Sequence, residues 1–260
     1  HAAVRAAMLW AFLPIAFLLH APYSEAVHLA FAAACLAAIV RGRMGLAALL
    51  LVGAALSRGA ALPLAGAVVV RAAMSLGPAW SARGPIATRR ARWLVPGAAL
   101  VISALAPWLW MLVAWRVTGR IDAVTASQGA WGVRLDPSAM VLAWREVIAH
   151  DGIALLFNPS VIVLAIVVTM TGATLFESRI PLELKAYTFL AAGLVLLVAQ
   201  PGAVAFGSIP RFAFGILTMP VMLARWLRRG WTGAIAAVAF TWLQYLWVLN
   251  VWSGRIGVAP

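Results

Sequence analysis

The sequence predicts an all-α fold, a polytopic integral membrane bundle of about nine transmembrane helices. Of its 260 residues, 65% are hydrophobic and 10% are charged, and the mean hydropathy is +0.98. A soluble domain is about half apolar and a quarter charged, so this composition excludes an ordinary globular domain. The long apolar runs lack the two-residue alternation of a barrel strand. Helices are then the structures that satisfy the backbone of these runs within lipid.

Basic and acidic residues lie in different connections between the apolar runs. Lys and Arg are enriched in the cytoplasmic loops of membrane proteins, so we expect the acidic stretch 117–152 to be an extracytoplasmic loop. The net charge of +13 does not indicate nucleic-acid binding, because a nucleic-acid surface gathers its bases on one face. The basic connections hold Arg41 and Arg43, Arg83 to Arg92, Arg179 and Lys185, and Arg225 to Arg229. Five of the seven acids lie elsewhere: Glu25, Asp122, Asp136, Glu146 and Asp151.

Each predicted helix is an apolar run, although several runs are near the short limit of roughly 17–25 residues for a span. Ser24 can cap the second run, with Glu25 favourable to the dipole in its first turn. The third and fourth runs flank Ser57–Gly59, and we expect a hairpin because the basic connections on either side should share one face of the membrane. A re-entrant segment is the alternative. The runs are 6–21, 25–40, 44–57, 60–77, 93–116, 153–173, 186–200, 210–224 and 231–250.

We see no sequence repeat and expect one membrane domain over residues 1–260, without a soluble module. Cys35 lies in an apolar run and is expected in the core, and the four histidines lack metal-ligand spacing, so no metal site of cysteines or histidines is predicted. The chain begins with His1 in place of Met, and we expect a fragment whose N-terminal part is missing. A composition rich in Ala, Arg, Gly and Val but poor in Lys is associated with GC-rich bacterial genomes.

Two arginines outside the cytoplasmic connections are candidate phosphate ligands. Charged groups within or beside the hydrocarbon are costly, so each one needs a reason. Arg58 lies between two apolar halves, and Arg211 opens a run on the same outer side, where a base opposes the helix dipole. A guanidinium fork fits a phosphate group. The alternative is interfacial anchoring, in which Arg58 snorkels from a hairpin tip.

Other polar residues on the outer side are candidates for contact with a sugar or an acceptor. Tyr23 and Glu25 flank Ser24 at the first outer tip, where the carboxylate could hold a hydroxyl or a metal, or serve only as a helix N-terminal acid. Trp131, with Gln128 three residues before it, could stack on a sugar ring or instead anchor an amphipathic helix on the membrane.

The order of these motifs resembles the PIG-V type of mannosyltransferase and its actinobacterial relatives, which are GT-C glycosyltransferases. The resemblance covers nearly the whole chain, and it depends on the order and spacing of the motifs together. It is carried by the aromatic and proline-rich run from Trp10 to the Tyr23-Ser24-Glu25 tip, Arg41-Gly42-Arg43, Ser57-Arg58-Gly59, the segment from Gly119-Arg120-Ile121-Asp122 to Gln128-Gly129-Ala130-Trp131, and Pro210-Arg211-Phe212.

The resemblance implies a lipid-linked donor, typically polyprenyl- or dolichyl-phosphate mannose, and transfer of the sugar by inverting displacement to a glycolipid or glycan acceptor. It implies a multi-pass protein of a bacterial plasma membrane whose active side is extracytoplasmic, with membrane lipid as a further partner. Arg58 and Arg211 would hold the donor phosphate. No other cofactor is implied, and a requirement for a divalent metal is left open.

The resemblance also concerns the catalytic acid, which in this fold class usually lies in the first outer loop. Nothing acidic precedes Glu25 in this chain. The general base is therefore expected upstream of His1, and the fragment alone would be inactive. Glu25 and Asp122 are weaker candidates for that role.

Two other classes of protein stay open. A transporter or lipid flippase also uses broken helices and intramembrane charges, but it should place polar groups near the midplane, whereas here they cluster at one interface. A non-catalytic lipid-binding subunit of an envelope-assembly complex is the other alternative, and the absence of an acid from the missing first loop would favour it.

Overall fold

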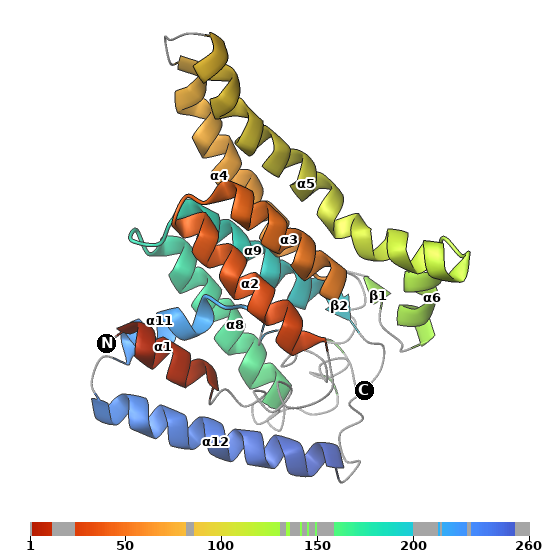
Figure 1. Ribbon diagram of the computed structural model, residues 1–260. Helices are drawn as coiled ribbons and strands as arrows, with labels where there is room; N and C mark the ends of the chain where they lie inside the picture. The colour runs from red at the N-terminus through yellow and green to blue at the C-terminus, as the bar shows by residue number, and fades with distance from the viewer. Residues whose placement is uncertain are drawn as a thin grey trace. The chain divides into compact units, whose positions relative to one another are not determined.

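The computed structural model describes residues 2–11, 24–81, 86–130, 134–135, 141, 145, 149, 159–199, 213, 215–227 and 230–252. Within these residues the chain is all-α, as predicted, with ten helices and one pair of two-residue strands (Figure 1). The helices are α1 (Ala2–Ala11), α2 (Glu25–Val40), α3 (Met44–Ser57), α4 (Leu62–Ser81), α5 (Ile86–Thr118), α6 (Ala123–Ala130), α8 (Pro159–Phe176), α9 (Leu182–Leu197), α11 (Met219–Trp226) and α12 (Gly230–Trp252). Strands β1 (Arg134–Leu135) and β2 (Val198–Ala199) pair antiparallel, with Arg134 opposite Ala199.

The polar connections end the helices close to the predicted positions. Helices α2 and α3 coincide with the predicted runs 25–40 and 44–57. Helix α5 begins at Ile86 instead of residue 93, because arginine is a good helix former and does not stop a helix as proline or glycine would. The predicted outer loop 117–152 includes the short helix α6 and strand β1.

The chain divides into two compact units, which are described separately. Unit 1 comprises His1–Pro22, Thr125–Phe176 and Ala191–Pro260, and unit 2 comprises Tyr23–Val124 and Glu177–Leu190. The single membrane domain expected over residues 1–260 stays a prediction.

In unit 2, α2 and α3 form an antiparallel hairpin closed by a glycine turn. Gly42 has a φ of 71°, a left-handed conformation that glycine adopts without a Cβ penalty. The N–H of Gly42 donates to the carbonyl of Ile39, and the N–H of Arg43 donates to the carbonyl of Ala38. These are the two bonds of a Schellman motif. The basic connection between the second and third predicted runs is therefore a tight turn.

Small residues let α2 and α3 approach closely. Cys35 is fully buried, as expected, and its thiol donates to the carbonyl of Ala47 at 3.3 Å. A Cβ added to Gly53 would lie 2.6 Å from Cε1 of Phe31, so the ring packs directly on the α3 backbone. Close approach through small residues is a common way for apolar helices to gain van der Waals contact.

The remaining helices of unit 2 pack around this hairpin. Helix α4 follows α3 after the turn at 58–61, and α5 packs along both α3 and α4. A Cβ added to Gly66 would overlap Cδ1 of Leu190, so α4 also packs against the middle of α9. The predicted run 60–77 is helical, as α4, and whether the region 44–77 is a spanning hairpin or re-entrant stays a prediction.

In unit 1, α1 packs against α11 and α12, and α8 packs against α11. Nη1 of Arg5 donates to the carbonyl of Leu227, the residue that ends α11, at 3.2 Å. A cation near the C-terminal carbonyls of a helix is favourable to its dipole, so Arg5 helps to attach α1 to α11.

One helix in the described part of the chain is long and apolar enough to cross a membrane by length and composition: Trp93–Thr118, within α5. The expected count of about nine crossings is therefore not supported, and one such helix is weak evidence of a span. The reason is length, because a helix of 16 residues such as α2 extends only about 24 Å, less than the ~30 Å hydrocarbon core. The shorter apolar helices are Glu25–Val40, Met44–Ser57, Leu62–Gly77 and Val163–Phe176.

Candidate functional site

Glu25 and Arg58, two residues singled out from the sequence, form an ion pair between Oε1 and Nη1. Glu25 is the first residue of α2 and Arg58 follows the last residue of α3, so the antiparallel hairpin brings them together although they are far apart in sequence. The side chain of Glu25 is 8% exposed and that of Arg58 is 22% exposed. Glu25 is thus the buried partner, and the side chain of Arg58 is the more exposed of the two.

The backbone beside Arg58 is held by three donors that converge on one carbonyl. The carbonyl oxygen of Ala54 accepts from Ser57 Oγ at 2.7 Å, from the N–H of Arg58 at 3.2 Å, and from Nδ1 of His28 at 3.1 Å. The His28 bond requires the tautomer that carries the proton on Nδ1. Because His28 lies one turn after Glu25 on α2, this bond fixes the end of α3 against the start of α2.

An aromatic side chain lies beside the same turn. A Cβ added to Gly59 would lie 3.4 Å from Cδ1 of Trp110 on α5, and Trp110 is 38% exposed. An indole beside this turn offers a flat apolar surface of the kind that a sugar ring or a prenyl chain can cover. The sequence analysis did not identify Trp110, because it lies within an apolar run where its neighbours are also hydrophobic.

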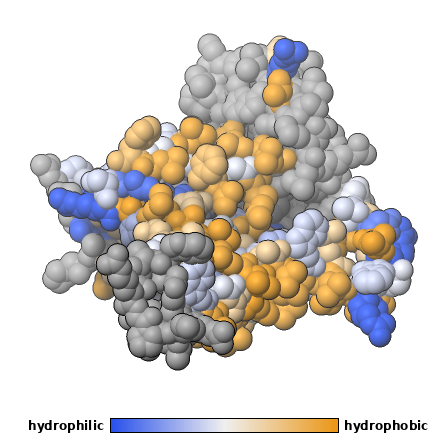
Figure 2. All heavy atoms as spheres, turned by 90° about the horizontal axis from the view of Figure 1, so that it is seen from above, coloured by the Kyte–Doolittle hydropathy of each residue, from blue (hydrophilic) through white to orange (hydrophobic). Residues whose placement is uncertain are grey.

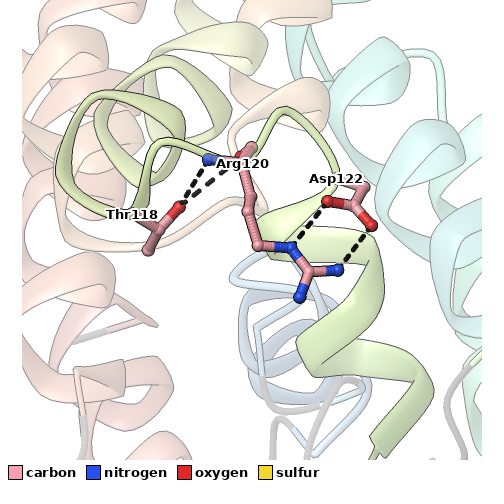
Figure 3. Close-up of polar contacts among 3 residues, drawn as sticks. All are labelled: Thr118, Arg120 and Asp122. Atoms are coloured by element: carbon pink, nitrogen blue, oxygen red, sulfur yellow. Dashed lines mark hydrogen bonds and ion pairs between the residues drawn. The ribbon is translucent and has the colours of Figure 1, made fainter.

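Asp122, the other weak acid candidate, is paired with Arg120 in an exposed fork at the end of α5 (Figure 3). Nε of Arg120 donates to Oδ1 of Asp122 at 3.1 Å, and Nη2 donates to Oδ2 at 2.8 Å. Thr118 Oγ1 accepts from the N–H of Arg120 at 3.2 Å, which orders the turn. The hydrogen bond from Arg120 lowers the pKa of Asp122 from its ordinary value. A weakly basic carboxylate that is already paired is a poor general base.

Four of the predicted site residues cannot be compared in full. Tyr23, Arg211 and Trp131 lie outside the described residues, and Gln128 has a described backbone in α6 but no described side chain. The assignments of Arg211 to the donor phosphate and of Tyr23, Gln128 and Trp131 to the sugar or acceptor stay predictions.

The structure also holds an ion pair that the sequence analysis missed. Nη1 of Arg71, on α4, lies 3.6 Å from Oε1 of Glu183 in the first turn of α9, and the side chain of Glu183 is 3% exposed. A Cβ added to Gly42 would lie 3.3 Å from Nη2 of Arg71, so this pair lies beside the α2–α3 turn. A lone arginine within the apolar run 60–77 was the available signal, since such a charge needs a partner.

Metal ligation finds no support in the described part of the chain, where no group of three or more His, Cys, Asp or Glu residues could hold an ion. Comparison with models of protein families, with curated proteins and with solved structures returns no match. The resemblance to GT-C mannosyltransferases therefore stays a prediction from the sequence motifs.

Proposed function

We propose that this chain belongs to a membrane glycosyltransferase of the GT-C kind, a mannosyltransferase that moves a sugar from a polyprenyl-phosphate donor to an extracytoplasmic glycolipid or glycan acceptor. The observation that carries the proposal is the Glu25–Arg58 pair at one end of an apolar helical hairpin. A guanidinium at that position matches a phosphate group whose prenyl chain lies along apolar helices.

The surface of α5 supports a lipid environment. Only 17% of its most apolar window is buried, whereas the core helix of a soluble protein would be mostly buried. In the view from above in Figure 2, hydrophobic residues cover much of the surface of the described residues, while hydrophilic residues gather in a few small groups. A contiguous exposed apolar surface of this kind needs lipid or protein to cover it. Its large exposed side chains include Leu94, Val101, Leu105, Trp108 and Leu112, which follow a helical spacing along one stripe.

The distribution of charge within unit 2 supports the sidedness of the proposal. The turn at Arg41–Arg43 lies at the end of the α2–α3 hairpin opposite to the Glu25–Arg58 pair. Arg71 connects that same turn to Glu183, and Arg179 and Lys185 flank Glu183 in sequence. Basic residues thus gather at one end of the bundle, as expected for the cytoplasmic side, and the candidate site lies at the other end.

In the proposed reaction, an acceptor hydroxyl oxygen attacks the anomeric carbon of the donor sugar while the bond from that carbon to the phosphate oxygen breaks. The bonding electrons leave with the prenyl phosphate, and the hydroxyl proton passes to a carboxylate that acts as general base. Arg58 would stabilise the negative charge that develops on the leaving phosphate. Arg211 is proposed as a second ligand of that phosphate from the sequence alone. Glu25 and Asp122 are the weak candidates for the base within this chain.

The position of the described ion pairs argues against a transporter or flippase. Such proteins place their substrate and ion sites near the middle of the membrane. In unit 2, the Glu25–Arg58 pair lies at one end of the α2–α3 hairpin, and the guanidinium of Arg71 reaches the turn at the other end.

The test is a transfer assay on the full-length protein in lipid nanodiscs with radiolabelled polyprenyl-phosphate mannose and a membrane acceptor extract. We expect labelled product, and at least about tenfold less of it with Arg58→Lys, because an ammonium cannot reproduce the two-point contact of a guanidinium with phosphate. Equal product from Arg58→Lys would refute the phosphate role of Arg58. Absence of transfer from several polyprenyl-phosphate sugars would refute the glycosyltransferase proposal.

A further inference from the structure

We infer that Glu25 is an internal counter-anion of Arg58, which a phosphate group must displace before it can bind. The inference rests on the proposed function, because it concerns how the same site admits its donor. It predicts that the carboxylate weakens phosphate binding, so that removal of an acidic residue from the site should make the site bind better.

The first support is the difference in exposure within the pair. The side chain of Glu25 is 8% exposed and that of Arg58 is 22% exposed, so an anion arriving from outside finds more of Arg58 than of Glu25 accessible. Carboxylates and phosphates use the same donor geometry on arginine. The Glu25 carboxylate contacts Nη1 of Arg58 through Oε1, so an anion that binds this nitrogen competes with it, and the one already attached lowers the apparent affinity for the other.

The second support is that the two partners are held differently. The turn that carries Arg58 is fixed by the three hydrogen bonds to the carbonyl of Ala54, one of which comes from His28 on the facing helix. The guanidinium is thus attached to a well-defined backbone. Glu25 is at the first position of α2, where the helix N-terminus favours a carboxylate with or without the arginine. Displacement therefore leaves the carboxylate in a position that remains favourable for negative charge.

Displacement makes a quantitative prediction that simple repulsion does not. If the Glu25 carboxylate must leave Arg58 first, the free energy of displacing it is the same for every anion that binds, whatever the charge of that anion. Repulsion from a carboxylate that stays in place would instead penalise a phosphate monoester, with a charge near −2, more than a diester with a charge of −1. The two mechanisms are therefore distinguished by comparing a monoester with a diester.

The experiment measures binding by calorimetry to the full-length protein in phosphatidylcholine nanodiscs, without sugar or acceptor. The probes are farnesyl phosphate, its methyl diester and inorganic phosphate. We expect Glu25→Gln to bind farnesyl phosphate about tenfold more tightly, equivalent to about 1.4 kcal/mol, and to bind the diester more tightly by the same factor. Arg58→Gln should lose this binding, alone or combined with Glu25→Gln. Glu177→Gln, which makes the same change of charge beside the Arg71 end of the bundle, should leave it unchanged.

Unchanged or weaker binding by Glu25→Gln would overturn the inference, and so would a gain for the monoester that clearly exceeds the gain for the diester. Inorganic phosphate identifies the source of the ligand: an equal gain with it indicates a site for phosphate in general, and a gain with the farnesyl probes alone indicates a lipid-linked phosphate. Both results support the competition. The binding experiment contains no sugar, so its outcome is independent of the transfer assay. Tighter binding by Glu25→Gln together with no mannose transfer in that assay would refute the proposed function and support the inference.

A measurement on the unaltered chain covers the case in which Glu25→Gln does not fold. Protein labelled with ¹³C at the glutamate side-chain carboxyls gives one resonance for Glu25, identified by its loss in Glu25→Asp. Farnesyl phosphate should shift this resonance while the Glu177 resonance stays in place. A Glu25 resonance that does not move at saturating farnesyl phosphate would refute displacement.

Discussion

Nη1 of Arg71 lies 3.6 Å from Oε1 of Glu183, and this contact joins α4 to the first turn of α9. Removal of one partner from a buried pair leaves an uncompensated charge, which typically costs about 3–5 kcal/mol. The side chain of Arg71 is 31% exposed, so we expect Arg71→Ala to lower the unfolding free energy by an amount near the low end, about 3 kcal/mol. Equilibrium unfolding in mixed micelles measures this change.

The control is the double variant Arg71→Gln/Glu183→Gln, which removes both charges. It should cost clearly less than Arg71→Ala, because no charge remains buried without a partner. Equal losses in the two variants would mean that Glu183 does not depend on Arg71.

The contact of Phe31 with Gly53 predicts that even one methyl group is too large at this position of α3. A Cβ at Gly53 would lie 2.6 Å from the ring, and an aromatic ring cannot rotate away as a long aliphatic chain can. We expect Gly53→Ala to destabilise unit 2 by about 1–3 kcal/mol, and Phe31→Leu to recover part of the loss. Gly45→Ala is the matched control in the same helix, because its Cβ would be 4.0 Å from the nearest atom, Cγ1 of Val95. It should be neutral or stabilising by up to about 1 kcal/mol.

The Arg120–Asp122 fork predicts a pH dependence of known sign. The pKa of Asp122 is lowered in the folded chain, so any stability that the pair contributes is present above the ordinary pKa of the carboxyl and is lost as the pH falls through the lowered value. In an NMR titration of the Asp122 carboxyl, Arg120→Gln should raise its pKa toward the ordinary value. An identical titration curve in the variant would show that the fork does not form in solution. Because both residues are exposed, we expect no measurable change in stability at neutral pH.

Sidedness predicts which turns a reagent can reach from outside the cell. Ile121 is 79% exposed beside the fork, and Arg43 is exposed in the opposite basic turn. In a Cys35→Ala background, a membrane-impermeant maleimide should label Ile121→Cys in intact cells and Arg43→Cys only after permeabilisation. Labelling of Ile121→Cys only after permeabilisation would place residues 117–152 on the cytoplasmic side and remove the basis of the proposed function.

The helix boundaries of unit 2 could be predicted because polar residues interrupt the apolar runs there. Glu25 begins α2, Arg41–Arg43 ends it, and Arg58 ends α3. Ser24 lies at the N-cap position of α2 as expected, but its helical backbone conformation leaves it without the expected side-chain cap hydrogen bond. The start of α5 was predicted too late, since arginines continue a helix as readily as they interrupt an apolar run. The number of membrane crossings was overestimated because an apolar run reports hydrophobicity, whereas a span also requires length.

The pairing of charges could not be predicted from the sequence alone. Glu25 and Arg58 were both singled out, but as a weak acid candidate and a phosphate ligand, and their contact appears only when α2 and α3 are folded against each other. Arg71 and Glu183 are separated by more than a hundred residues, and no local sequence pattern indicates which carboxylate forms an ion pair with which arginine. Apolar runs and the polar residues that interrupt them indicate where helices begin and end, whereas the partners of distant charged residues depend on how the helices pack.

The length of α5 has a consequence for the cell. At 33 residues it extends about 50 Å, some 20 Å more than a hydrocarbon core of about 30 Å. If its apolar part, Trp93–Thr118, lies in that core, the turns of α5 that begin at Ile86 extend past it into the adjacent aqueous compartment, on the side away from the proposed chemistry. The sequence of those turns contains Arg89, Arg90 and Arg92.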